Sequence, residues 1–527
     1  MRSSVSTHRK ITVAALAAAE KRSDLLLFLV IFVTVFLATP LLVLVGAATS
    51  FGYLLGILAA LAAAGLVVKW PMSGLYILTG CVVLVEQEPL PTPIFTDRLL
   101  IFYWPASLNG LPERPIGFFM LFVLLVYLCR RLALRQRVLW GGPLFLPFLL
   151  FLLAVAMGVA HGLASGGTLQ IIVLEIRPLW YLFVAYLIAY NFISQKRHVR
   201  AIFWMLIVGA GVKGAQGVYI FLVLFHGSTT GHNEIMAHEE SLFFVAMVLL
   251  LVLFFLHHRY RRQVIALLVI MPFVLLATLA NQRRADYVAL LVGLIVAWVL
   301  VFMVKPQARK RLATGLVIVA ILATGYVLAF SHAGGSLASP ARAIISIFDP
   351  TAADPRDISS NFYRDIENFD LKFTVKQSPI IGWGFGKPFL QPTPLPNIQT
   401  LDPYYNYIPH NTIYWIWMRL GAIGYFLLWY LLGAAIVRGC MIARRLHDAY
   451  LQLVAIFIVS ATIMEIIVAY ADYQLFFYRN VLYLGLLLGL LMKLPALDMD
   501  EEKEHRTDEV VSGIKSSAPA SVGGQRA

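Results

Sequence analysis

Arginines stand where apolar segments of this chain begin. The stretch LANQRRADYVALLVGL, from Leu279 to Leu294, sets Arg283, Arg284 and an aspartate between two long apolar runs. A helix N-terminus presents unpaired N–H groups and the positive end of the helix dipole, so it attracts anions. An arginine adds a planar fork of donors that suits phosphate oxygens. If several such helix ends converge, they would form a site for a phosphate or a pyrophosphate.

Two other segments also place a functional side chain where an apolar run starts. Arg177, in LEIRPLWYLFVAYLIAY, is expected in the first turn of a helix, because Pro178 favours that position. His410 precedes Asn411, which is a suitable N-cap for the next run. Each of these residues could also have a purely structural role. Arg177 could pair with Glu175, His410 could cap a helix or lie at the interface, and the arginine pair could bind lipid headgroups or Asp286.

The composition indicates what must position these residues. The chain has 527 residues, of which 60% are hydrophobic and 13% charged, and a mean hydropathy of +0.79, which indicates a polytopic membrane protein. It contains about fourteen apolar runs of roughly 17 to 25 residues, each long enough to cross a bilayer as a helix. These runs do not alternate as barrel strands do, so the expected fold is all-α. The first run follows a basic leader and is expected to stay as an anchor.

The connections between the runs alternate in charge. With the N-terminus inside, every strongly basic short connection falls on one side, which the positive-inside rule assigns to the cytoplasm. The net charge of +14 is therefore explained without nucleic acid. Arg283 and Arg284 break this rule, because they join expected spans over 264–280 and 287–304 on the outer side. A charge placed against topology favours a ligand or a partner.

The expected divisions of the chain follow from this topology. They are a cytoplasmic leader over 1–23, about eleven spans over 24–330, a large extracytoplasmic loop over 331–409, about three spans over 410–495, and a disordered cytoplasmic tail over 496–527.

The large loop is too long for a simple connection and too polar for the bilayer. Part of it, SSNFYRDIENFDLKFTVKQSP, predicts a helix that is capped by Ser359 or Ser360 and ends before Pro379. A glycine turn, GWGFG, follows over 382–386. Candidate substrate contacts in the loop are Arg364, Gly384 and Gly386. The acidic residues Asp349, Asp354 and Asp357 are interpreted as a solvated loop.

No metal or cofactor is expected from the sequence. The outer connections show no carboxylate pair at metal-ligand spacing. The cysteines Cys81, Cys129 and Cys440 lie in or beside apolar runs without CxxC or Cys/His spacing, so neither zinc nor a disulfide is expected.

Three blocks resemble the O-antigen ligase and O-antigen polymerase-like family of bacterial membrane glycosyltransferases. RRADYVALLVGL is similar to that family's Ser-Arg helix start, NFYRDIENFDLKFTVKQSPIIGWGFG to its large-loop helix and glycine turn, and HNTIYWIWMRLGAIG to its His-Asn start with a Leu-Gly-x-x-Gly element. The order of the blocks also fits, over roughly 170–440. Two positions depart from the family pattern. Arg419 stands where many members carry a glutamate, and Arg283 replaces a small polar residue.

The resemblance implies a GT-C-like fold in the bacterial inner membrane, with both termini cytoplasmic and the active site facing outward. It implies transfer of a glycan from an undecaprenyl-pyrophosphate-linked donor to a lipid or saccharide acceptor, without a metal. Arg284 and Arg177 would be catalytic, because they would hold the pyrophosphate and stabilise the negative charge that develops as the anomeric bond breaks. The residues that would bind the pyrophosphate or belong to the loop are Arg283, Asn411, Arg364, Gly384 and Gly386. His410 would be the general base, and neighbouring arginines would favour its neutral form.

Other function classes stay open. A polymerase of the same family would share this chemistry. A solute transporter would need ionisable groups near midplane, for which Lys213 and Glu465 are the candidates, although no matching half-repeat is visible. A purely structural membrane protein is a third possibility. Tail contacts for the lipid are not assigned.

Overall fold

The protein is described by a computed structural model over most of its length. The described residues are 51–87, 113–136, 139–228, 235–257, 261–306, 309–331, 338–346, 349, 355–399 and 402–516. Within them all regular elements are helical, which agrees with the all-α prediction. The first expected span, from about 24, lies outside the described residues.

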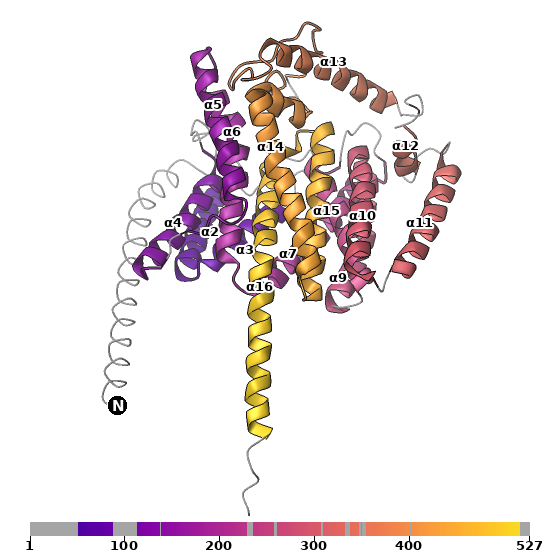
Figure 1. Ribbon diagram of the computed structural model, residues 1–527. Coiled ribbons are helices and arrows are strands. Elements are labelled where there is room, and N and C mark those ends of the chain that lie inside the picture. The colour runs from indigo at the N-terminus through magenta and orange to yellow at the C-terminus, as the bar shows by residue number, and fades with distance from the viewer. Residues whose placement is uncertain are drawn as a thin grey trace, which may run out of the picture.

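Helices that are far apart in the chain pack side by side in the bundle, as α10 does with α15 and α6 with α16 (Figure 1). The bounds of the helices are α2 Phe51–Lys69, α3 Met72–Leu84, α4 Pro115–Ala133, α5 Phe145–Ala164, α6 Leu169–Phe192, α7 Lys196–Tyr219, the π-turn η2 Ile220–Leu224, α8 His238–His257, α9 Arg261–Asn281, α10 Arg284–Val304, α11 Arg309–Phe330, α12 Ser339–Ile345, α13 Pro355–Gln377, α14 Thr412–Arg445, α15 Ala449–Ala471, the 3-10 turn η6 Gln474–Phe476, and α16 Tyr478–Ser516. Ten helices in the described part of the chain are long and apolar enough to cross a membrane. Shorter apolar helices cover Leu58–Lys69, Met72–Leu84 and Ile321–Phe330.

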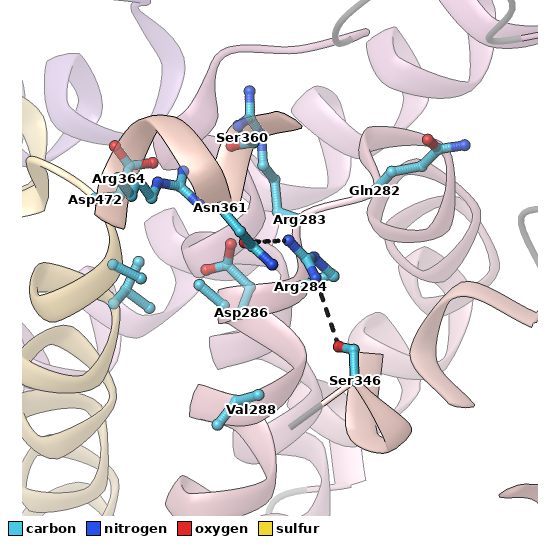
Figure 2. A pocket seen from close by; sticks show the side chains of 13 residues that line it. Gln282, Arg283, Arg284, Asp286, Val288, Ser346, Ser360, Asn361, Arg364 and Asp472 are labelled. Carbon is cyan, nitrogen blue, oxygen red and sulfur yellow. Dashed lines mark hydrogen bonds between the residues drawn. The ribbon is translucent and has the colours of Figure 1, made fainter. Parts of the chain in front are cut away.

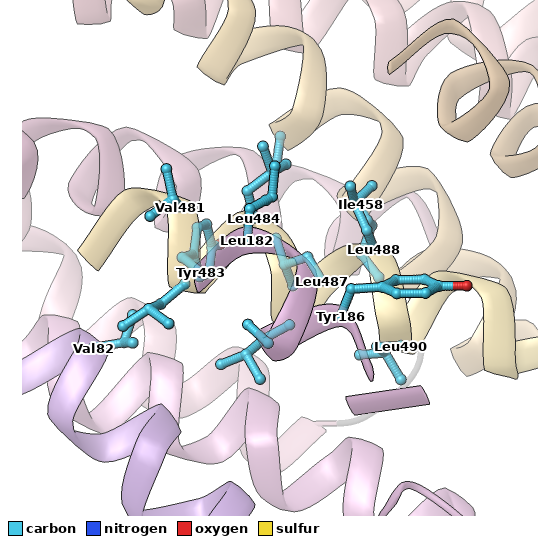
Figure 3. Packing of buried hydrophobic residues seen from close by; sticks show 14 of the residues in the cluster. Val82, Leu182, Tyr186, Ile458, Val481, Tyr483, Leu484, Leu487, Leu488 and Leu490 are labelled. Atoms are coloured by element: carbon cyan, nitrogen blue, oxygen red, sulfur yellow. The ribbon is translucent and has the colours of Figure 1, made fainter. Parts of the chain in front are cut away.

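The tightest helix contact in the centre joins α6 and α16 (Figure 3). Gly485 and Gly489 lie four residues apart on α16, and a Cβ atom on either would come within 2.5 Å of the backbone oxygens of Leu182 and Tyr186. Small residues at this spacing let two helix backbones approach closely in a membrane. The pair α6–α16 therefore forms a fixed axis, and the residues that begin α16 are held with it.

The connections of the basic set meet one another at one end of the bundle. Arg130 donates to the backbone oxygen of Lys69 at 3.0 Å. Lys196 pairs with Asp448 at 2.5 Å, and the Asp448 N–H bonds to Asp498 at 2.9 Å. Each of these contacts joins two connections that were both predicted to be cytoplasmic.

The other set meets at the opposite end, where α12 and α13 lie (Figure 1). The Thr168 N–H bonds to the Gly386 oxygen at 2.9 Å, and the Met236 N–H bonds to Asn281 at 3.0 Å. The contacts thus sort the connections into the two predicted sets. We call the end with α12 and α13 the loop end.

Three local expectations were wrong. Helix α6 begins at Leu169, so Arg177 lies in its third turn and Pro178 inside it, because Thr168 at the N-cap is fixed by the loop backbone. Helix α13 begins at Pro355, a residue suited to a first turn, so neither Ser359 nor Ser360 caps it. Helix α16 continues to Ser516, where disorder was expected from 496.

Candidate functional site

A cavity of about 290 Å³ opens at the loop end beside the start of α10 (Figure 2). Arg283 is the N-cap of α10 and Arg284 its first residue, as the sequence predicts for an arginine pair at a helix mouth. Arg364, from α13, supplies a third guanidinium. The cavity is lined by Gln282, Arg283, Arg284, Ala285, Asp286, Val288, Ser346, Ser360, Asn361, Arg364, Val468, Ala471 and Asp472.

Side chains from the loop hold Arg284 at this cavity. Its Nη2 donates to Oδ1 of Asn361 on α13 at 2.9 Å, and its Nη1 lies 3.5 Å from Oγ of Ser346, which follows α12. Both bonds use neutral oxygens. The positive charge of Arg284 is therefore oriented without being cancelled by a carboxylate at these two contacts.

One face of α13 serves both the cavity and His410. Asn361, Arg364 and Glu367 follow at intervals of three residues, which places them on neighbouring turns of the same helical face. Asn361 and Arg364 line the cavity. Glu367, which is 1% exposed, contacts His410.

His410 is held by a buried carboxylate and by two aromatic rings. Glu367 accepts the His410 backbone N–H at 3.0 Å and lies 3.1 Å from Nδ1 of its ring. The rings of Tyr363 and Tyr473 meet the imidazole edge-on, with centroids at 5.6 Å and 5.3 Å. Asn411 caps α14 through the Tyr414 N–H, as predicted. Burial first, and then the charges of Glu367 and Asp402, raise the pKa of Tyr363, so its hydroxyl keeps its proton.

Asp472 and Tyr473 connect the cavity to His410. Asp472 lines the cavity, while the ring of Tyr473 packs on His410. Thr412 Oγ1 donates to the Asp472 backbone oxygen at 3.2 Å, which ties the start of α14 to this segment. Burial acts to raise the pKa of the Asp472 carboxyl, but the charges of His238, Arg364 and Arg283 outweigh burial and lower it below the ordinary value. Asp472 is therefore a carboxylate.

Arg177 does not line this cavity. Its Nη1 donates to the hydroxyl of Tyr478 at 2.6 Å, and its Nε lies 3.6 Å from Glu113. The sequence-based alternative of a pair with Glu175 is wrong, since Glu175 is bound by Arg419 instead. Tyr478 is the first residue of α16. Through this bond Arg177 holds the end of the 472–477 segment in place and does not line the cavity.

Gly384 and Gly386 also lie away from the cavity lining. Their φ values are 81° and 83°, a region that favours glycine. A Cβ atom on Gly384 would come within 2.8 Å of Gly162, and one on Gly386 within 2.9 Å of the Thr168 oxygen. The glycine turn is therefore packed against the ends of α5 and α6, and its glycines allow that close approach.

Arg419, where a family glutamate was expected, holds this turn in place. It is fully buried and pairs with Glu175 at 2.5 Å. It also donates to the backbone oxygens of Gly384, Lys387 and Tyr407 at 3.0, 2.7 and 2.9 Å. Arg419 thus joins α6, α14 and both ends of the segment that leads to His410.

No group of three or more His, Cys, Asp or Glu that could hold a metal ion is present among the described residues. Asp354 of the expected acidic cluster lies outside them. The candidate site is thus composed of three arginines, a histidine with its carboxylate, and two further carboxylates.

A comparison with protein families gives one match. Residues 273–429 match the family model described as O-antigen ligase. This region of the chain is therefore similar to the O-antigen ligase family. The matched region includes Arg283, Arg284, α13, the glycine turn and His410, which are the residues that carried the resemblance. No curated protein matches the chain.

Several residues of this candidate site were missed by the sequence reasoning. They are Asn361, Glu367, Asp472, Tyr473 and His238. The spacing of Asn361, Arg364 and Glu367 was a usable signal, because it marks a polar face on a predicted helix. Asp472 and Tyr473 lie in a short connection, and nothing in the sequence places that connection beside α13.

Replacing Arg419 by Gln is expected to destabilise the ligase-like site. The change leaves Glu175 buried without its cation and removes donors to three carbonyl groups, and breaking such a pair costs about 3 to 5 kcal/mol. The expected result is a lower thermal unfolding temperature in detergent and faster protease cleavage over 382–410. Arg445→Gln, at the exposed far end of α14, is the matched control. Equal stability of the two variants would contradict this account.

Proposed function

We propose that the protein is a membrane glycosyltransferase that moves a glycan from a lipid-linked diphosphate to an acceptor hydroxyl. The observation that carries this proposal is the placement of a cavity lined by three arginines near a histidine fixed by a carboxylate, mostly within the region that matches the O-antigen ligase family model. The first group suits a leaving diphosphate, and the second suits a proton acceptor.

Arg283, Arg284 and Arg364 would hold the diphosphate of the donor. As the anomeric carbon–oxygen bond breaks, negative charge grows on the bridging oxygen. Fixed guanidinium groups at a low-dielectric site stabilise this charge more in the transition state than in the ground state. Asn361 and Ser346 keep Arg284 oriented, so little reorganisation is needed during the reaction.

His410 would remove the proton from the acceptor hydroxyl as that oxygen attacks the anomeric carbon. With Nδ1–H donated to Glu367, Nε2 keeps the lone pair that a base requires. Attack on the face opposite the diphosphate gives inversion at the anomeric carbon. Asn411 contributes as the N-cap that starts α14 directly after the base.

In this proposal three residues position other parts of the site and do not touch the donor. They are Arg177, Gly384 and Gly386. Arg177 fixes Tyr478, and through it the segment with Asp472 and Tyr473. The two glycines seat the loop against α5 and α6. We place the loop end outside the cytoplasm, in the periplasm of a bacterial inner membrane, because the basic connections gather at the other end. There the donor is an undecaprenyl-linked glycan.

The transporter alternative loses its main support. Lys213 is completely buried and bound to Glu86 and, at 3.2 Å, to Glu240. A lysine held by two carboxylates ties α7 to its neighbours and serves the bundle's structure. A polymerase shares the chemistry proposed here and differs only in the acceptor.

A deletion strain separates these functions by its glycans. If the protein is a ligase, long lipid-linked polymer accumulates and attachment is lost. If it is a polymerase, single repeat units accumulate. Size-resolved analysis of lipid-linked and attached glycans measures both. Unchanged glycans together with altered solute uptake would contradict the glycosyltransferase proposal.

His410→Gln is expected to lower the turnover number by about 10² to 10⁴-fold, the usual contribution of a general base. Glu367→Gln also lowers it, because an amide can donate to Nδ1 and so favour the ring tautomer that cannot act as base. Glycan transfer by purified protein in liposomes with a lipid-linked donor measures both variants.

His447→Gln is the control for these variants, because His447 also lies beside a carboxylate, Asp498, but at the opposite end of the bundle. It should transfer glycan normally. Normal transfer by His410→Gln at equal membrane level would remove the base assignment.

Arg284→Lys keeps a positive charge but loses the planar fork. We expect turnover to fall on the order of 10²-fold, since the two bonds to Asn361 and Ser346 and a bidentate grip on phosphate cannot all be kept. The same assay measures the loss, with Arg309→Lys at the start of α11 as control. If Arg284→Lys works as well as the wild type, charge alone suffices and the bidentate account is wrong.

A further inference from the structure

The cavity contains two carboxylates that an anion site does not need. Asp286 is 2% exposed and Asp472 is 6% exposed, and both line the space that we assign to a diphosphate. Bare carboxylates repel phosphate, and burial strengthens that repulsion. Arg283 and Arg364 offset part of this repulsion, and a proton-bearing group beside Asp472 would offset more of it.

His238, the first residue of α8, supplies that group. Its Nδ1 lies 3.0 Å from Oδ2 of Asp472. The ring of Tyr473 stands between His238 and His410, with centroids at 6.3 Å and 5.3 Å. Two histidine–carboxylate pairs, His238–Asp472 and His410–Glu367, therefore flank one tyrosine.

The position of His238 is fixed by the residues that follow it. Glu239 and Glu240 are buried and bind Arg479 at 3.3 Å and 2.5 Å. Arg479 also donates to the backbone oxygens of Val82 and Val83 at the end of α3. The first turn of α8 is thus locked to the first turn of α16, only a few residues after Asp472.

Charged side chains from several elements surround His238. Asp472 contacts it directly, Asp286 on α10 and Glu239 on α8 lie within electrostatic reach, and Arg283 and Arg364 face Asp472 from the other side. The Asp472 carboxylate beside Nδ1 favours the charged form of the imidazole, and the arginines near Asp472 oppose it.

We propose that His238 and Asp472 form a proton-donating pair for the leaving diphosphate. This inference rests on the proposed function. His410 and His238 would then divide the work, because one accepts the proton of the acceptor hydroxyl and the other supplies a proton to the departing group.

The step balances as follows. The acceptor oxygen bonds to the anomeric carbon and loses its proton to Nε2 of His410. The bond from the anomeric carbon to the phosphate oxygen breaks, and its electron pair stays on that oxygen. The proton on Nδ1 of His238 passes through the carboxylate of Asp472, which lines the cavity, to the diphosphate. His238 is left neutral and is reprotonated from water, while His410 returns its proton to water.

The test uses binding of inorganic pyrophosphate to the full-length protein in detergent. Titration calorimetry between pH 6.5 and 8.5, in two buffers of different ionisation heat, counts the protons taken up on binding. At the upper end of this range, where the free pair has lost its proton, the wild type is expected to take up more protons than His238→Gln, by at most one. Its affinity should fall faster with rising pH, by up to about tenfold per unit for one linked proton. Protonation of pyrophosphate itself is common to all variants.

Three further variants make the outcome decisive. Asp472→Asn should lose the same proton uptake, and it serves where His238→Gln does not fold. His410→Gln and His447→Gln should keep it. Equal proton uptake by wild type, His238→Gln and Asp472→Asn overturns this inference and leaves the proposed function standing. If the wild type binds no pyrophosphate, or if Arg284→Ala binds it equally well, the proposed diphosphate site is wrong and this inference falls with it.

Discussion

The site depends on one constraint: a charge buried in an apolar bundle must be paired. Taking an ion out of water costs several kcal/mol, so an unpaired partner is strongly destabilising even where the pair itself adds little stability. Arg419 with Glu175 and Arg479 with Glu240 are such pairs, and each joins helices that are far apart in sequence. Because neither partner can be released cheaply, these pairs fix the glycine turn and the start of α16. The residues of the candidate site lie beside these pairs, so their positions are fixed as well.

Helix α13 connects the large loop to the candidate site. Its face with Asn361, Arg364 and Glu367 touches Arg284 on one side and His410 on the other. The glycine turn that follows α13 is held by Arg419, so the helix is anchored beyond its C-terminal end. In the proposed mechanism the loop is therefore part of the active site, because it contributes polar residues to it. This explains why a long polar segment is inserted between two apolar spans.

The sequence predicted the elements whose signals are local. Arg283 and Arg284 at the mouth of α10, the cap at Asn411, and the two sets of connections all follow from hydropathy and charge along the chain. The features that could not be predicted depend on contacts between residues that are far apart in the sequence. Arg177 was misplaced because Pro178 suggested a first turn, whereas the loop fixes the helix start at Thr168. Asp472 and Glu367 gain their significance only from partners far away in the chain.

The charge balance of the cavity indicates how it discriminates between ligands. Three arginines and two acidic side chains line the cavity, so its net charge is positive but smaller than that of three bare guanidinium groups, and it costs less to desolvate. A ligand with a single negative charge gains little against this balance. A diphosphate brings several charges and many acceptor oxygens, and it can bind the arginines bidentately while a nearby proton offsets its repulsion from the carboxylates.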